Sequence, residues 1–177
     1  MSELNNRPPA KKVSESVVEC QLYEIFPSDL NSQNTMFGGR VMEITDKKAG
    51  LAAMLHARQQ CVTAQVDGFR FVSPAKMGEV LIFKAAVNRV WCSSLEVGIK
   101  VLAWDLKTNA KRHVVSAYFT FVALGADSEG CKICLPEVLP ETEDEKRRYS
   151  EAEERRSHRL REAGKIPQDN QSVPGKV

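Results

Sequence analysis

Three kinds of residue near the start of the chain could together act on a carbonyl group. Gly38 and Gly39 stand side by side before a long helical pattern, Asp46 lies further along that pattern, and Asn31 lies in the preceding loop. The first backbone N–H groups of a helix are unpaired, and glycines leave them unshielded by any Cβ. The pattern predicts an oxyanion hole for an ester or thioester carbonyl at Gly38 and Gly39, with Asp46 about two turns away. The alternative is a plain flexible turn, for which pairs of glycines are also used.

Asp46 interrupts a mostly apolar helical segment that runs from about residue 38 to residue 57. The residues that share its arc on a helical wheel are mostly small: Met42, Ala49, Ala53 and His56. Small side chains let another backbone approach, which would partly desolvate the carboxylate. The alternative is an exposed helix edge where Asp46 is solvated beside Lys47 and Lys48, and the helix alone does not favour either interpretation.

Metal and cofactor chemistry have little support in the sequence. Cys131 and Cys134 have metal-ligand spacing, but no second pair or histidine stands close to them, so we expect no metal site. His56 is expected to be a hydrogen-bonded structural residue rather than a base. A Ser-His-Asp set and a phosphate-binding glycine loop are not readable in the sequence, and the predicted chemistry needs no cofactor.

Composition and charge exclude several classes of protein. The chain has 177 residues, of which 42% are hydrophobic and 27% charged, as in ordinary globular domains. A net charge of +2 without a basic stripe argues against nucleic acid as a partner, and no apolar run is long enough to span a membrane. The polar N-terminus and the five cysteines, an odd number without a disulfide-framework spacing, predict a cytoplasmic protein with reduced thiols.

The elements that would position these residues form an α+β meander. A strand is expected over 17–26, a loop over 27–37 and the helix from about 38 to 57. Four β-rich runs then follow: "CVTAQVDGFRFVS", "GEVLIFKAAVNRVW", "SSLEVGIKVLAWDL" and "RHVVSAYFTFVAL". Successive antiparallel strands with one helix inserted after the first predict a sheet whose one face is covered by the helix.

The domain boundaries follow from composition. We expect a disordered tail at 1–13, one folded domain at 14–126, a linker with a charged helix at 127–166, and a second disordered tail at 167–177. Thr142 and Glu145 have the spacing of a capping box at the start of the charged helix. Its apolar stripe is thin, so it is interpreted as a solvated helix that docks lightly, with a partner-binding or RNA-binding arm as the alternative.

Several blocks of the sequence resemble one known family. The segments "SDLNSQNTMFGGRVMEITDKKAGLAAMLHA", "VTAQVDGFRFVSPAKMGEV" and "AYFTFVAL" are similar, in order and spacing, to the hotdog-fold acyl-CoA thioesterases of the single-domain bacterial type. These are relatives of the tandem-domain cytosolic acyl-CoA hydrolases of animals. The resemblance covers about residues 16–126 and extends to the "PETEDEKRRY" helix that some members carry.

The resemblance implies an activity and its residues. Asn31 and Asp46 match the family's catalytic pair, and the amides of Gly38 and Gly39 would stabilise the oxyanion while a fatty acyl-CoA is hydrolysed to free acid and CoA. Asp46 would act as general base or as nucleophile, and Asn31 would position the water or the carbonyl. The acyl-chain length is not determined by the sequence.

The resemblance also implies an assembly. The family forms homodimers, and by resemblance trimers of dimers, with the Asn of one chain facing the Asp of the other at the dimer interface. The alternative is a hotdog module that binds acyl-CoA as a sensor without cutting it, which the presence of both Asn31 and Asp46 disfavours. A hydratase would need a His paired with the acid, and no histidine is placed for that role.

The chain departs from the family in two places. Asn34 stands where glycine is usual, and asparagine tolerates the left-handed conformation that such a turn needs. The second departure lies in the turn that approaches CoA, where the family has Gly-Arg before two hydroxyl residues and this chain has Trp91-Cys92. Arg89 is the candidate for the missing cation, and Ser93 and Ser94 match the two hydroxyl residues.

Overall fold

A five-stranded antiparallel sheet forms the centre of the protein. The computed structural model describes residues 7–125 and 133–164. The sheet has the order β2-β4-β5-β6-β3, so β2 and β3 are its edges. Its strands are β2 (Val18–Glu24), β3 (Cys61–Phe71), β4 (Glu79–Val90), β5 (Ser94–Asp105) and β6 (Lys111–Ala123).

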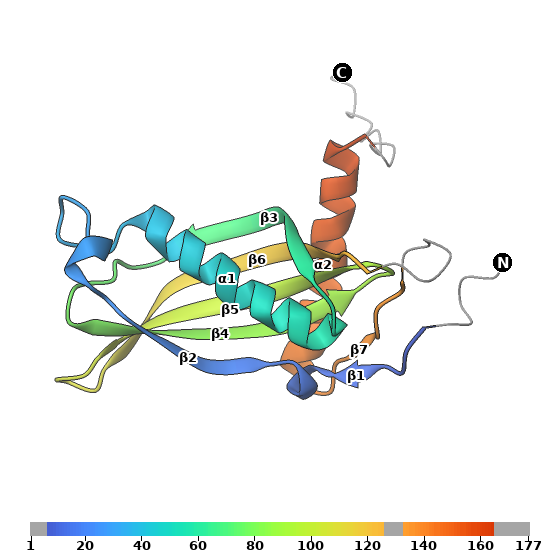
Figure 1. Cartoon of the computed structure of the whole chain (residues 1–177), viewed down its shortest axis with the longest axis horizontal. Helices are drawn as coiled ribbons and strands as arrows, with labels where there is room; N and C mark the ends of the chain where they lie inside the picture. Colours follow the sequence, from blue (N-terminus) through green and yellow to red (C-terminus); the bar gives the residue numbers. More distant parts are fainter. Residues whose placement is uncertain (1–6, 126–132, 165–177) are drawn as a thin grey trace, which may run out of the picture.

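The helix α1 (Gly38–Ala57) lies along one face of this sheet, as Figure 1 shows. Its buried positions include Val41, Ile44, Ala49 and Ala53, and they pack against the inward-facing residues of the strands. On β5 the inward-facing residues alternate with outward-facing ones: Leu95, Val97, Ile99, Val101 and Ala103. A long central helix wrapped by an antiparallel sheet is the hotdog fold, so the expected fold and the expected helix bounds are confirmed.

The second helix, α2 (Glu143–Glu162), crosses the opposite face of the sheet (Figure 1). Thr142 accepts a hydrogen bond from Glu145 N–H, which confirms the predicted capping box. The docking is not light, however. Arg155 donates two hydrogen bonds of 2.8 and 2.9 Å to the fully buried Glu96, and Arg159 lies 2.6 Å from Asp67. The arginines of α2 compensate for its thin apolar stripe by pairing with carboxylates on the outer sheet face.

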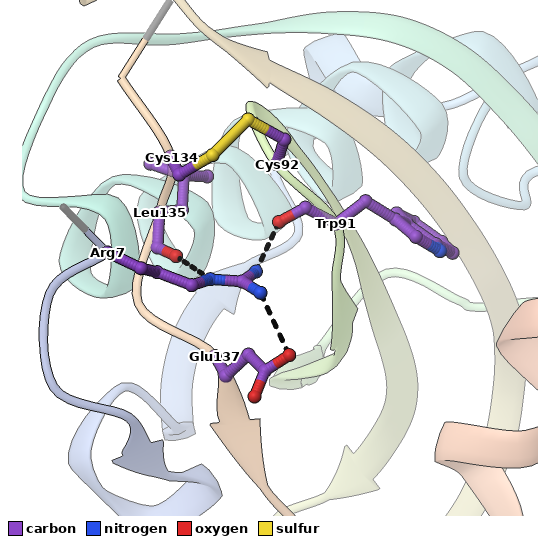
Figure 2. The surroundings of a disulfide bond; sticks show 6 residues. All are labelled: Arg7, Trp91, Cys92, Cys134, Leu135 and Glu137. Atoms are coloured by element: carbon purple, nitrogen blue, oxygen red, sulfur yellow. Dashed lines mark hydrogen bonds and ion pairs between the residues drawn. A yellow bond between two sulfur atoms is a disulfide. The ribbon is translucent and has the colours of Figure 1, made fainter. Parts of the chain in front are cut away.

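The N-terminal segment corrects one expectation. Residues 7–13 were expected in a disordered tail, but β1 (Lys11–Lys12) pairs in parallel with β7 (Val138–Leu139). Arg7 donates to the carbonyl oxygens of Trp91 and Leu135 and to the carboxylate of Glu137, as Figure 2 shows. A polar segment therefore becomes ordered because distant backbone acceptors meet one guanidinium. Residues 1–6 and 167–177, the remainder of the two expected tails, lie outside the described residues.

The cysteines correct a second expectation. Cys92, after β4, and Cys134 form a disulfide with a Cα–Cα distance of 4.4 Å (Figure 2). The expectation that all thiols are reduced is therefore wrong, and the cysteines no longer support a reducing compartment. The cause is a long-range approach of two segments, which spacing along the sequence does not reveal. Cys131, the other half of the metal-ligand spacing, lies outside the described residues.

His56 is a buried structural residue, as expected. Its Nε2 lies 2.9 Å from the carbonyl oxygen of Pro136, and its Nδ1 lies 3.1 Å from Ser16 Oγ. A carbonyl oxygen only accepts, so Nε2 carries the proton and Nδ1 accepts from the hydroxyl. Burial, the largest influence, lowers the pKa of His56, which is therefore held neutral. Within residues 7–125 and 133–164, no helix is long and apolar enough to cross a membrane.

Candidate functional site

The first turn of α1 carries free backbone donors. Phe37 is the N-cap residue, and its own N–H donates to the carbonyl oxygen of Asp29 at 2.8 Å, so this group is already occupied. Within the described part of the chain, the N–H groups of Gly38 and Gly39 have no backbone acceptor. These two groups, and not that of Phe37, can therefore receive a carbonyl oxygen.

Aromatic rings lie close to the two glycines. A Cβ on Gly38 would come within 3.3 Å of the Phe71 ring, and one on Gly39 within 2.6 Å of the Phe37 ring. Both rings are half exposed. Glycine thus allows the rings to lie against the helix start, where they reduce the water around the N–H groups and strengthen a hydrogen bond to a developing oxyanion.

A buried carboxylate fixes the direction in which the helix begins. Asp29 is 4% exposed and accepts hydrogen bonds from Tyr23 Oη, Phe26 N–H and Arg40 Nε at 2.9 to 3.0 Å. Burial alone would raise the pKa of Asp29, but these hydrogen bonds outweigh it and lower the pKa below its usual value. The sequence analysis missed this cluster, because the acid meets its partners only once the loop has folded.

The loop before the helix is held by Asn31. Its Oδ1 accepts from Gln33 N–H at 2.9 Å and from Thr35 N–H at 3.2 Å, and its Nδ2 donates to Thr35 Oγ1 at 3.0 Å. Asn34 has a φ of 58°. The expectation that this asparagine adopts the left-handed conformation in place of a glycine is therefore confirmed.

Asp46 lies on the edge of α1 that faces β3. Its side chain is partly exposed, and Thr63 Oγ1 on β3 donates a hydrogen bond of 2.6 Å to its Oδ1. Of the residues that share its helical arc, Ala49, Ala53 and His56 are buried within the chain, whereas Met42 is 41% exposed. Asp46 therefore stands where the buried part of the stripe ends. Thr63 was missed by the sequence analysis, because its relation to Asp46 depends on how β3 lies beside the helix.

One chain does not bring all the candidate residues together. The hydrogen bonds of the Asn31 side chain stay in its own loop, and Asp46 follows Gly38 by about 12 Å along the helix axis at 1.5 Å per residue. The edge strand β3 pairs only with β6 among the described strands and exposes Val62 and Val66 by 45% and 40%. An open edge with apolar side chains next to Asp46 can accept a second chain.

The three residues assigned to CoA differ in their availability. Arg89 Nε lies 3.1 Å from Glu153 Oε2, and its guanidinium stacks on the Tyr149 ring at 4.2 Å, so it holds α2 on the sheet. Ser93 stands in the turn after β4 and Ser94 is the first residue of β5, and their hydroxyls bond to no residue that the structure describes. Among the described residues, Arg89 is therefore engaged and the two hydroxyls are not.

A metal has no evident binding site here. In the parts of the chain that the structure describes, no three His, Cys, Asp or Glu side chains gather as ligands.

Comparisons with known proteins give the family of the chain. Residues 33–108 match the family model described as the thioesterase superfamily. The Bacillus subtilis protein YkhA, named an uncharacterized acyl-CoA thioester hydrolase, is 36% identical over 76% of this chain and 77% of its own length. Protein VdlD of Helicobacter pylori is 39% identical over 78% of each chain.

Solved structures show the same fold. The acyl-CoA hydrolase of Staphylococcus aureus, in complex with butyryl-CoA, CoA and CoA disulfide, aligns with a TM-score of 0.78 at 37% identity, over 88% of this chain and 93% of the other. A hexameric acyl-CoA thioesterase aligns with a TM-score of 0.81 at 33% identity, over 88% and 98%. The chain belongs to the thioesterase superfamily and is a hotdog-fold relative of acyl-CoA thioester hydrolases.

Proposed function

We propose that the protein hydrolyses fatty acyl-CoA to the free acid and CoA. The observation that carries this proposal is the helix α1 itself, which presents free N–H groups at Gly38 and Gly39 and a carboxylate at Asp46 that Thr63 holds by a hydrogen bond. A thioester needs a group that stabilises its oxyanion and a group that activates water or attacks. The helix carries both kinds about 12 Å apart, so the two groups that meet one thioester would come from the helices of two chains.

In this proposal Asp46 is the general base or the nucleophile. The hydrogen bond from Thr63 occupies Oδ1 and leaves Oδ2 to face the water or the thioester carbon. The amides of Gly38 and Gly39 stabilise the negative charge that develops on the carbonyl oxygen, and Asn31 binds the water or the carbonyl.

The Staphylococcus aureus relative supports these residues. Its structures include three separate alanine mutants, of one Asp, one Asn and one Thr. Each mutated residue carries a number three below that of Asp46, Asn31 or Thr63, and its type is the same in each case. A constant offset across three positions supports the correspondence.

We propose further that the site is shared between two chains. Asn31 of one chain would face Asp46 of the other, with the β3 edges of the two chains joined into a continuous sheet. The hydrogen bonds that keep the Asn31 side chain in its own loop and the open edge beside Asp46 support this arrangement. The hexameric relative supports a trimer of such dimers.

The CoA moiety would approach the turn that carries Ser93 and Ser94. Arg89 remains a candidate for its phosphates only if it leaves Glu153, so the serines are the stronger part of this assignment. A cytoplasmic location stays a prediction.

The test is release of free thiol from acyl-CoA substrates of increasing chain length, from acetyl- to palmitoyl-CoA. The wild type should release CoA, and Asp46→Asn should bind the same substrates but lower turnover by about 10²-fold or more, because it removes the base with little change of shape. Tight binding without thiol release by the wild type would favour the sensor instead, and near-normal turnover by Asp46→Asn would refute the role of Asp46.

A further inference from the structure

The orientation of the Asn31 amide is set by its own loop. Two backbone N–H groups, of Gln33 and Thr35, point at Oδ1 at 2.9 and 3.2 Å. If the amide were turned over, its NH₂ group would face these two donors, and both backbone N–H groups would lose their acceptor. The loop therefore fixes Oδ1 as the atom that faces the backbone N–H groups and Nδ2 as the donor on the other side of the amide.

Thr35 completes this arrangement. Its hydroxyl lies 3.0 Å from Asn31 Nδ2 and accepts one of the two N–H bonds of that nitrogen. The same hydroxyl lies 3.2 Å from Oδ1. The second N–H of Nδ2 has no acceptor among the residues that the structure describes, and Asn31 is only half buried. One donor thus remains available, while the acceptor side of the amide is used.

We propose that Thr35 is a positioning residue: its backbone N–H, with that of Gln33, fixes Nδ2 as the donor of the Asn31 amide, and its hydroxyl holds that donor in place for the thioester carbonyl. This inference rests on the proposed function, in which Asn31 binds either the water or the carbonyl, and it selects the carbonyl. An amide that can only donate cannot accept a proton from the attacking water, and donation to one of the two lone pairs of that water would lower its nucleophilicity. Donation to the carbonyl oxygen instead strengthens as negative charge develops there.

The first test is Asn31→Asp, which keeps an acceptor for Gln33 and Thr35 N–H but removes the donor. Thermal unfolding should stay close to that of the wild type, while kcat for thiol release should fall by about 10²-fold or more, as for the loss of an oxyanion donor. Asn31→Ala, which removes both functions, should lower the unfolding temperature as well. Turnover of Asn31→Asp near that of the wild type would show that the acceptor is the working group and would overturn the inference.

The second test is the matched pair Thr35→Val and Thr35→Ser. Valine has nearly the same shape without the hydroxyl, so kcat should fall by about fivefold, the effect of one neutral hydrogen bond, with KM little changed. Serine keeps the hydroxyl and should restore kcat. An unchanged kcat in Thr35→Val, or an equal loss in both variants, would show that the hydroxyl does not position the amide.

The outcomes separate this inference from the proposed function. A wild type that releases no thiol from any acyl-CoA refutes the function and the inference together. An active wild type whose Asn31→Asp variant is equally active refutes the inference alone. If Thr35→Val fails to fold, Asn31→Asp still tests whether Asn31 acts as a donor, because it keeps an acceptor for the N–H groups of Gln33 and Thr35.

Discussion

At the scale of single residues, the candidate catalytic side chains are held by hydroxyl groups of neighbouring threonines. Thr63 and Thr35 each place a hydroxyl beside one candidate catalytic side chain, at 2.6 Å from Asp46 Oδ1 and 3.0 Å from Asn31 Nδ2. Neither hydroxyl stands out in the sequence, because threonine is common in strands and loops and its role depends on a neighbour from elsewhere in the chain.

Thr63→Val should lower kcat by about tenfold or more, because a hydrogen bond to a carboxylate is worth roughly 1.5–3 kcal/mol. The hydroxyl orients Asp46, so Thr63→Ser should stay near the wild type. Steady-state thiol release measures both variants. Equal turnover in Thr63→Val and the wild type would mean that Asp46 needs no such support.

His56 predicts a pH dependence of stability. Burial lowers its pKa in the folded state below the usual value of about 6.5, so the unfolded chain binds the proton more readily. The free energy of unfolding should therefore be constant above about pH 6.5 and should fall as the pH decreases below it, until the lower pKa of the folded state is reached. The pKa of Asp29 is lowered in the folded state, so its carboxylate also stabilises the fold. This contribution is lost only at more acidic pH, because carboxyl groups titrate near pH 4.

The measurement is urea unfolding between about pH 8 and pH 5 for the wild type and for His56→Gln. The variant lacks the titrating group and should lose most of this slope, even if its stability is lower throughout. A slope that is the same in both proteins would assign the effect to other groups.

At the scale of elements, patterns that depend on local periodicity were predictable from the sequence. The bounds of α1, the alternation of β5 and the left-handed Asn34 follow from spacing and intrinsic preference, and the structure shows each of them. The N-terminal segment, the disulfide and the cluster around Asp29 were not predictable, because each joins residues far apart along the chain or in a folded loop. Asn31 and Asp46 were recognised through the resemblance, and the structure places them on one loop and one helix.

The charged helix α2 packs firmly on the sheet although its apolar stripe is thin, because its arginines pair with buried carboxylates. Arg155→Met removes the partner of the fully buried Glu96 and should lower the free energy of unfolding by about 3 kcal/mol, because an unpaired buried charge remains. Arg147→Met on the same helix removes an exposed pair with Glu151 and should cost about 0.5 kcal/mol or less. Chemical unfolding of the two variants compares them, and equal losses would contradict the docking described for α2.

At the scale of the whole molecule, the proposed site needs residues from two chains. The sheet ends at the open edge of β3 beside Asp46, and Asn31 stands in a loop beyond the start of α1. A chain of this design would be incomplete as a monomer, so light scattering should find a dimer or a multiple of it.

The most direct measurement of this claim is complementation between two inactive variants. Asn31→Ala and Asp46→Ala chains are co-expressed, mixed dimers are isolated or verified, and thiol release from acyl-CoA is measured. Each mixed dimer has one site with both residues and one with neither, so isolated mixed dimers should show about half of the wild-type activity. In an unfractionated random mixture about half of the dimers are mixed, so about a quarter of the activity should return. If both residues of a site come from one chain, every mixed site lacks one of them. Verified mixed dimers whose activity stays at the level of the single variants would contradict the shared site.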